Sequence, residues 1–267
     1  MNLNEILQLA QEAARAAGDY ARSKIGSAQV SLKAAEQIVT QVDQQCQKMI
    51  VDRILEGFPD HGIIGEEGTA DQTLKRPPTG DEDIWWIIDP LDGTRNYAHG
   101  AAQYAVSIGV MRDGLPVAGA IYDPSTNMMF SARQGGPAEC NGQIIHCRDE
   151  ILNSNSQLAI SGNIFDWLPL CVAEIMEKYT YMNLGSAALH YAYVAMGAYS
   201  AAFAGEVKLW DIAAGAIISQ CAGAVVNDLR GKARFPINPH DYQSQPLQII
   251  IGADSIQRQL NEIFSRT

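Results

Sequence analysis

The stretch Ile87–Gly100, IIDPLDGTRNYAHG, changes from apolar to acidic within a few residues. The apolar run Ile84–Ile88 predicts a buried strand. Asp89 comes directly after it, and Asp92 follows three residues later, beyond a proline that bends the chain. Two carboxylates at the end of a buried strand repel each other and lose hydration, unless a cation lies between them. The stretch therefore predicts a site for a hard divalent cation such as Mg²⁺, which takes oxygen ligands.

Gly93 and Thr94 follow directly and provide what a phosphate group requires. Backbone N–H groups at a tight turn or helix start bind phosphate, and a glycine lets the backbone approach. The Thr94 hydroxyl can orient a water molecule. The chain has no G-x-x-x-x-G-K-[ST] loop, which argues against hydrolysis of nucleoside triphosphates. The two aspartates are three residues apart rather than two, which argues against the D-x-D-x-T phosphoaspartate mechanism of haloacid-dehalogenase-type phosphatases.

Other acidic residues occupy positions that packing alone does not require. Glu66 and Glu67 end the segment HGIIGEEG, Asp43 lies early in a predicted helix, and Asp211 lies at the start of an apolar helix. Each has a structural alternative. The glutamates and Asp43 can be solvated, Asp89 can be a turn residue, and Asp211 can be a helix N-cap. Considered together, these residues indicate a metal site.

The composition narrows the possible functions. The 267 residues are 47% hydrophobic and 18% charged, which is typical of a soluble globular protein. The formal charge of −11 argues against direct nucleic-acid binding and against binding to anionic membranes. Five scattered cysteines without a C-x-x-C pair, no signal-peptide pattern and no apolar run of about 20 residues predict a cytoplasmic protein.

The order of predicted elements favours a layered α/β fold, mixed with α+β, in one domain over residues 1–267. Its N-terminal α+β half covers about 1–150 and its C-terminal α/β half about 151–267, and residues 69–83 are predicted to be an exposed loop. The predicted helices are Leu3–Ala17, Gln41–Gly57, Phe165–Tyr179, Ser186–Met196, Trp210–Cys221 and Ser255–Phe264. The predicted strands are Ile84–Ile88, Tyr104–Met111, Pro116–Tyr122, Asn127–Ala132, Leu158–Ser161, Met182–Leu184, Tyr199–Ala204, Ala224–Asn227 and Leu247–Gly252.

These motifs resemble those of the inositol monophosphatase family of Mg²⁺-dependent, Li⁺-sensitive phosphatases. The matching segments, in the family's order over nearly the whole chain, are IVTQVD (38–43), GEE (65–67), WIIDPLDGT (86–94), YAVSIGV (104–110), CNGQ (140–143), GSAALHY (185–191) and WDIAAG (210–215). The resemblance implies a layered αβαβα sandwich of the inositol monophosphatase/fructose-1,6-bisphosphatase type. It also implies a homodimer, two or three Mg²⁺ ions per active site, and a small phosphorylated alcohol as substrate, with inositol 1-phosphate the leading choice.

The resemblance assigns roles to the acidic residues. Glu66, Asp89 and the Leu91 carbonyl would bind the first metal. Asp89, Asp92 and Asp211 would bind the second metal. Glu66 would also hold a third metal, largely through water molecules, which makes it a catalytic residue as well as a ligand.

It also assigns the residues that handle water and substrate. Thr94, oriented by Asp43, would position the attacking water, so both are expected to be catalytic. Lys33 corresponds loosely to a family lysine near the phosphate. The residues expected to bind substrate are Asp92, Gly93, Thr94, Gly185, Ser186, Ala187 and Glu206.

The sequence departs from the family at the position that contacts inositol. Family members that prefer inositol phosphates carry a glutamate seven residues before the aspartate of the WD motif, and here that position is Ala204. Glu206 can replace it if the loop shifts, and Lys208 belongs to the same wall. Histidinol phosphate, fructose 1,6-bisphosphate and 3′-phosphoadenosine 5′-phosphate are therefore alternative substrates. A regulatory protein-binding factor in transcription or ribosome biogenesis is an alternative of another class.

Overall fold

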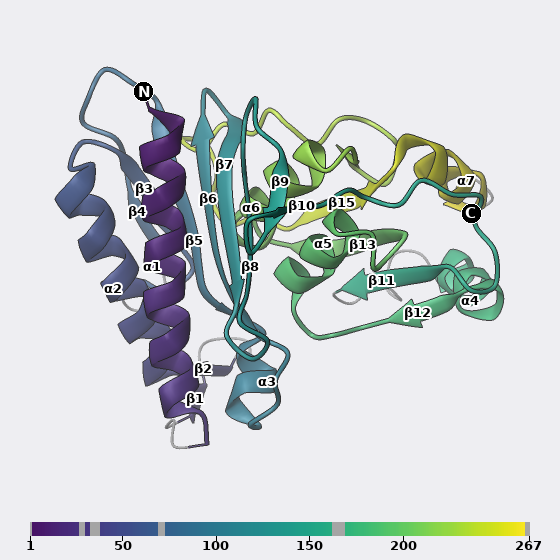
Figure 1. Cartoon of the computed structure of the whole chain (residues 1–267), viewed down its shortest axis with the longest axis horizontal. Coiled ribbons are helices and arrows are strands. Elements are labelled where there is room, and N and C mark those ends of the chain that lie inside the picture. Colours follow the sequence, from purple (N-terminus) through teal and green to yellow (C-terminus); the bar gives the residue numbers. More distant parts are fainter. Residues whose placement is uncertain (1, 27–29, 33–37, 69–72, 162–168, 265–267) are drawn as a thin grey trace.

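The computed structural model describes residues 2–26, 30–32, 38–68, 73–161 and 169–264, which form alternating layers of helices and sheets (Figure 1). The helices in these residues are α1 (Leu3–Lys24), α2 (Gln41–Gly57), α3 (Thr94–Ala98), α4 (Pro169–Lys178), α5 (Ala187–Ala195), α6 (Leu209–Cys221) and α7 (Asp254–Phe264). The strands are β1 (Val30–Leu32), β2 (Ile38–Thr40), β3 (Gly62–Gly65), β4 (Leu74–Arg76), β5 (Ile84–Asp92), β6 (Ala105–Arg112), β7 (Leu115–Asp123), β8 (Met128–Arg133), β9 (Ala138–Cys140), β10 (Gln143–Ile144), β11 (Gln157–Ser161), β12 (Thr180–Met182), β13 (Ala201–Val207), β14 (Val225–Asn227) and β15 (Leu247–Gly252).

The first sheet has eight strands in the order β10-β9-β8-β7-β6-β5-β3-β4. All its neighbouring strands are antiparallel except β3 and β5. Helices α1 and α2 cover its outer face, as Figure 1 shows on the left. The side of α1 that meets the sheet is rich in alanine, for example Ala10, Ala13 and Ala17, so this helix can lie close to the strands.

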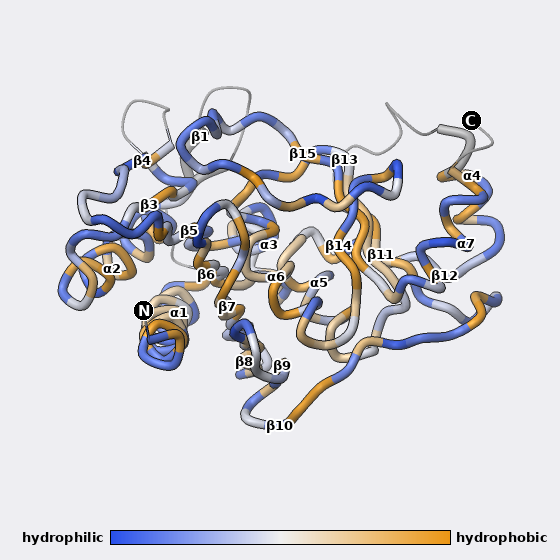
Figure 2. Tube along the Cα trace, turned by 90° about the horizontal axis from the view of Figure 1, so that it is seen from above, coloured by the Kyte–Doolittle hydropathy of each residue, from blue (hydrophilic) through white to orange (hydrophobic). Residues whose placement is uncertain are grey.

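Helices α5 and α6 form the layer between the two sheets, and Figure 2 shows them largely in hydrophobic colours. Both are buried on nearly all sides, which explains their almost uniformly apolar sequences. Helix α6 packs closely against the first sheet. A Cβ atom at Gly109 on β6 would lie 2.6 Å from the Ala213 Cβ atom, so only glycine allows this approach. The close packing brings the N-terminal turn of α6 toward β5.

The second sheet has five strands in the order β12-β11-β13-β15-β14, and α4 and α7 pack on its outer side. Strand β11 is parallel to both of its neighbours, whereas β13 and β15 are antiparallel. The pairing of β13 with β15 shifts register between Ala204 and Val207. This irregularity displaces Gly205 and Glu206 from the regular pleat.

The predicted layered mixed α/β fold is confirmed, with local differences. Strand β5 continues beyond Ile88 to Asp92, so the two acids lie in the strand and not after it. The predicted loop 69–83 contains β4 at the edge of the first sheet, and β12 ends at Met182 where the prediction began a strand. The first four residues of the predicted helix Phe165–Tyr179, and Lys33, lie outside the described residues. Among the described helices, none combines the length and the hydropathy needed to cross a membrane.

Candidate active site

Three carboxylates from two elements meet beside the first sheet. Asp89 and Asp92 come from β5, and Asp211 comes from α6. One ligand oxygen from each lies within 4.8 Å of those of the other two. Residues three apart on a regular strand point to opposite faces. Here the pairing between β5 and β6 shifts register between Asp89 and Asp92, and this bulge turns both side chains toward one space.

Asp211 is not the N-cap of α6, which was its structural alternative. The N-cap is Lys208, and Asp211 occupies the third helical position. Its Oδ2 atom accepts a hydrogen bond of 2.7 Å from the Lys208 backbone N–H. This contact fixes the carboxylate at the positive end of the helix dipole, where a negative charge is favoured.

Burial makes the charged form of these acids costly. It raises the pKa of Asp89 well above its usual value, and the nearby charges of Glu66, Asp92 and Asp211 raise it further. Burial also raises the pKa of Asp92, and it raises the pKa of Asp211 to about 7 with help from Asp92. The three aspartates form no ion pair with a lysine or arginine among the described residues. Three buried carboxylates without such a cationic partner suit a hard divalent cation, whose charge would offset the repulsion among them.

Glu66 lies outside the three-carboxylate group but close enough for its charge to raise the pKa of Asp89. Its backbone N–H donates to the Ile88 carbonyl at 3.1 Å, which fixes the end of β3 beside β5. The buried side chain of Gln47 on α2 forms hydrogen bonds with both backbone groups of Glu67, the residue that follows Glu66. Its amide donates to the Glu67 carbonyl, and its Oε1 atom accepts from the Glu67 N–H at 2.8 Å. Sequence analysis missed Gln47, because a glutamine on a helix carries no signal of this contact.

Asp43 and Thr94 are in direct contact. The Thr94 hydroxyl donates to Asp43 Oδ1 at 2.9 Å, and the Leu91 carbonyl oxygen lies at the same distance from it. Asp43 is 1% exposed, and its Oδ2 atom accepts from the Thr40 N–H at 2.9 Å in a capping box of α2. Burial raises the pKa of Asp43 despite these hydrogen bonds. Gly93, with φ of 95°, makes the turn that places Thr94 next to Asp92.

A pocket of about 210 Å³ opens beside the aspartates, and we call it the carboxylate pocket. Its lining residues are Asp92, Ser161, Asn183, Gly185, Ser186, Ala187, Glu206, Val207 and Asp211. The Asp92 Oδ2 atom accepts two hydrogen bonds of 2.6 Å, from the Ser186 hydroxyl and the Ala188 N–H. The structure thus brings Gly185, Ser186, Ala187 and Glu206 together with two of the candidate metal ligands.

Ser161, which sequence analysis missed, has a hydroxyl oriented by His190. The fully buried imidazole accepts from the Leu184 N–H at Nε2, at 2.8 Å, so the neutral ring carries its proton on Nδ1. Nδ1 lies 2.5 Å from Ser161 Oγ and therefore donates to it. Burial lowers the pKa of His190 to about 4, so the ring is neutral at pH 7. Because Ser161 accepts from His190, its own proton is available to a group in the pocket.

The wall at the inositol position differs from the family pattern. Ala204 is fully buried opposite Ile249 on β15 and does not line the pocket. Glu206 does line it, because the register shift after Ala204 carries this exposed side chain to the pocket wall. The Lys208 ammonium instead donates to the Ser244 carbonyl at 2.7 Å.

Comparisons with known proteins identify the family of the chain. The profile of the inositol monophosphatase family matches residues 2–266. The chain is 33% identical to the Nus factor SuhB of Xylella fastidiosa over 95% of this chain and 92% of that protein. It is 37% identical to a fructose-1,6-bisphosphatase/inositol-1-monophosphatase of Thermotoga maritima over 73% of each.

Solved structures give the same result. The extragenic suppressor protein SuhB of Bartonella henselae superimposes with a TM-score of 0.87 at 26% identity, covering 98% of this chain and 99% of that one. An IMPase of Thermotoga maritima superimposes with a TM-score of 0.85 at 28% identity, covering 98% and 97%.

Proposed function

The chain belongs to the inositol monophosphatase family, and on that basis we propose that it is a Mg²⁺-dependent phosphomonoesterase acting on a small phosphorylated alcohol. The observation that carries the proposal is the convergence of Asp89, Asp92 and Asp211 within 4.8 Å at the edge of a pocket. Buried carboxylates that raise one another's pKa are costly in a purely structural role. A metal-assisted hydrolysis gives them a function.

The metal ligands would be the three aspartates together with Glu66 and the Leu91 carbonyl, for two or three Mg²⁺ ions. When bound, Mg²⁺ supplies a Lewis acid that neutralises phosphate charge, activates a water molecule and stabilises the leaving alkoxide. The Leu91 carbonyl already faces the Thr94 hydroxyl, so the water-handling residue lies next to a proposed ligand.

Thr94 and Asp43 would orient the attacking water. Since the Thr94 hydroxyl donates to Asp43 Oδ1, its oxygen has lone pairs that can accept a hydrogen bond from a water molecule. Asp43 is held by Thr40, so the direction of this contact is fixed before substrate binds. The backbone N–H groups of Gly93 and Thr94 would hold the phosphate.

The alcohol part of the substrate would occupy the carboxylate pocket. Ser161 presents a donor there and Glu206 an acceptor, so a hydroxylated alcohol such as inositol 1-phosphate fits the wall chemically. Histidinol phosphate, fructose 1,6-bisphosphate and 3′-phosphoadenosine 5′-phosphate remain the alternatives. We extend the proposal to inhibition by Li⁺, as in the family that the sequence resembles.

The test is phosphate release from these four esters and glycerol 2-phosphate, with Mg²⁺ or with EDTA. We expect Mg²⁺-dependent release, with the highest kcat/KM identifying the substrate. Thr94→Ala should lower kcat by about a hundredfold, whereas Thr94→Ser should retain most of it, because serine keeps the hydroxyl that orients the attacking water. Release that is independent of divalent metal, or a fully active Thr94→Ala variant, would contradict the proposal.

A regulatory role is a second candidate, favoured by the 33% identity to a protein named Nus factor SuhB. With a chain charge of −11, we propose contact with a protein rather than direct contact with nucleic acid. Affinity capture of transcription proteins by both the native chain and Asp89→Asn would support a role separate from hydrolysis. Capture of none would count against it.

The proposed enzyme is a cytoplasmic homodimer in which the whole chain, residues 1–267, acts as one catalytic domain. The active site takes Asp43 and Thr94 from the N-terminal half and Ser186 and Asp211 from the C-terminal half, so neither half contains a complete site. Light scattering after size-exclusion chromatography should give about twice the 29.0 kDa chain mass. A measured mass equal to that of a single chain would contradict the dimer.

A further inference from the structure

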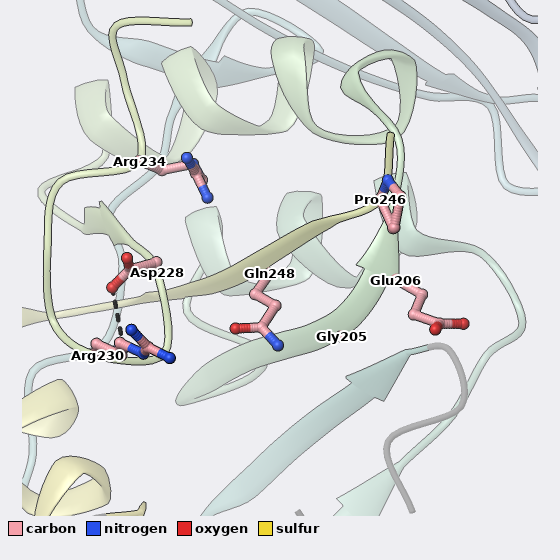
Figure 3. Close-up of a pocket in the computed structure, with 7 residues that line it drawn as sticks. All are labelled: Gly205, Glu206, Asp228, Arg230, Arg234, Pro246 and Gln248. Carbon is pink, nitrogen blue, oxygen red and sulfur yellow. Dashed lines mark hydrogen bonds between the residues drawn. The ribbon is translucent and has the colours of Figure 1, made fainter. Parts of the chain in front are cut away.

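A second pocket lies on the other side of Glu206. It has a volume of about 420 Å³, and we call it the arginine pocket (Figure 3). Its lining residues are Gly205, Glu206, Asp228, Arg230, Arg234, Pro246 and Gln248. Glu206 lines both pockets, since the β13 irregularity places it between them.

The loop that carries Arg230 is fixed by its own hydrogen bonds. Asp228 Oδ1 accepts from the backbone N–H groups of Arg230 and Lys232, each at 2.9 Å. The Asp228 N–H donates to the Lys232 carbonyl at 2.7 Å, which closes the loop. Asp228 therefore fastens the backbone, and it forms no ion pair with Arg230 or Arg234. The backbone that carries Arg230 is fixed, and neither guanidinium group is neutralised by Asp228.

Arg234 is anchored at its backbone, where its N–H donates to the Val226 carbonyl at 3.1 Å. Its Nε atom is buried and has no hydrogen-bond partner. Within the described part of the chain, the side chains of Arg230, Arg234 and Gln248 have no hydrogen bond or ion pair. In Figure 3 the carboxylate of Glu206 points away from these three side chains. A buried charged donor without an acceptor is costly, which indicates that an acceptor is supplied from outside the chain.

We propose that Arg230, Arg234 and Gln248 form a binding site for a phosphate group. Two guanidinium groups and one amide offer planar, directional donors, and a phosphate has several oxygens to accept them. Two acids, Glu206 and Asp228, also line the pocket, but Asp228 accepts from backbone N–H groups and Glu206 points away, so the two guanidinium groups are left to face an incoming anion. The phosphate has two possible sources. It belongs either to a free ligand, inorganic phosphate or a phosphorylated effector, or to a substrate that extends from the carboxylate pocket past Glu206 and carries a second phosphate. Binding of phosphate here does not depend on the proposed hydrolysis.

The test is titration of inorganic phosphate into the whole protein by isothermal calorimetry in EDTA, without Mg²⁺. Under these conditions the carboxylate pocket repels phosphate, so binding reports the arginine pocket. We expect Arg230→Gln and Arg234→Gln each to weaken binding by about tenfold or more, as for loss of one charge-assisted contact. Lys232→Gln removes the same charge from the same loop outside the pocket and should leave the affinity within about twofold.

Failure of the native chain to bind phosphate, or equal affinity in the native chain and both arginine variants, would overturn the site. Arg230 is exposed, so its variant keeps the test decisive even if Arg234→Gln does not fold. The source of the phosphate is then distinguished with Mg²⁺ present. A loss of kcat/KM in Arg230→Gln for a bisphosphate alone identifies the substrate's second phosphate. If Arg230→Gln instead keeps the native kcat/KM for both mono- and bisphosphates but loses phosphate binding, the ligand of the pocket is a free phosphate or a phosphorylated effector.

Discussion

The carboxylate pocket and the arginine pocket share the wall formed by Glu206, yet only the arginine pocket is lined by cationic side chains. The carboxylates come from β5 and α6, two elements that are buried in the core. The arginines come from a short loop and a β-bridge at the edge of the second sheet. Among the described residues, the aspartates of the first pocket and the two arginines of the second form no ion pair, so each group can bind a ligand of the opposite sign. The net charge of the chain, −11, agrees in sign with the first pocket and gives no indication of the two arginines in the second.

The largest effect is expected from Asp89→Asn, which removes a carboxylate from the centre of the acidic group. We expect kcat to fall by about a thousandfold or more, since metal ions contribute several kcal/mol to such reactions. In EDTA at pH 8, the same variant should melt at a higher temperature than the native chain. The raised pKa of Asp89 means that its ionised form costs stability, and asparagine removes that cost.

Asp81→Asn is the matched control, since Asp81 is exposed and outside both pockets. It should change neither kcat nor the melting temperature in EDTA. If Asp89→Asn melts below the native chain in EDTA, the three carboxylates stabilise the fold on their own and the proposed contrast between the pockets is wrong.

The next largest effect is expected from His190, on how the free energy of unfolding changes with pH. Its folded pKa of about 4 lies below the unfolded value near 6.5, so the unfolded state binds more protons between these limits. The neutral imidazole therefore contributes its full stability above pH 6.5, and this contribution is lost as the pH falls toward 4. At 1.36 kcal/mol per pKa unit, the total loss in the free energy of unfolding is roughly 3 kcal/mol.

Urea unfolding of the native chain and His190→Gln from pH 7 to pH 4.5 isolates this contribution as a difference. The difference should shrink as the pH falls, whereas Arg230→Gln should follow the native chain at every pH. A constant difference between the native chain and His190→Gln would show that the imidazole titrates normally.

Selective stabilisation by ions gives an effect of similar size. At Mg²⁺ concentrations of a hundred times Kd, the native chain should gain about 2.7 kcal/mol of stability by mass action. Asp211→Asn should lose most of this gain, while Arg234→Gln should keep it. Thermal unfolding at increasing Mg²⁺ concentrations measures both. Equal gains in the two variants would place the cation elsewhere.

The smallest effect is expected from Ser161→Ala, which removes the donor presented to the carboxylate pocket. Loss of one neutral hydrogen bond to the alcohol should raise KM by about tenfold and leave kcat within about twofold. Steady-state kinetics on the best substrate measures the two separately. Ser154→Ala, at an exposed position, is the control, and an unchanged KM in Ser161→Ala would remove Ser161 from substrate binding.

Much of the fold was predictable because hydrophobic periodicity reports which face of an element is buried. The helix predicted over Gln41–Gly57 matches α2, and the strands predicted over Tyr104–Met111 and Pro116–Tyr122 match β6 and β7 within one or two residues. Short edge strands were missed. β4 lies in a polar, Pro-rich stretch, and its strand conformation comes from pairing with β3 and not from its own composition.

The candidate metal ligands could be selected from the sequence because buried acids interrupt apolar runs. Ser161 and His190 could not, because one hydrogen bond between residues on β11 and α5 leaves no pattern in either segment. The arginine pocket could not be predicted from the sequence either. Arg230 and Arg234 form no recognisable motif, and only the fold brings Gln248 on β15 beside them.

The sequence alone determined that Asp89, Asp92, Gly93 and Thr94 lie together, because they are neighbours in the chain. The tertiary structure alone decided what meets them. Ser186, 94 residues from Asp92, donates to its carboxylate, and α6 brings in Asp211 because Gly109 allows the helix to pack closely. The bulges in β5 and β13 decided which side chains face the pockets, since the direction of a side chain on a strand depends on the register with its neighbour.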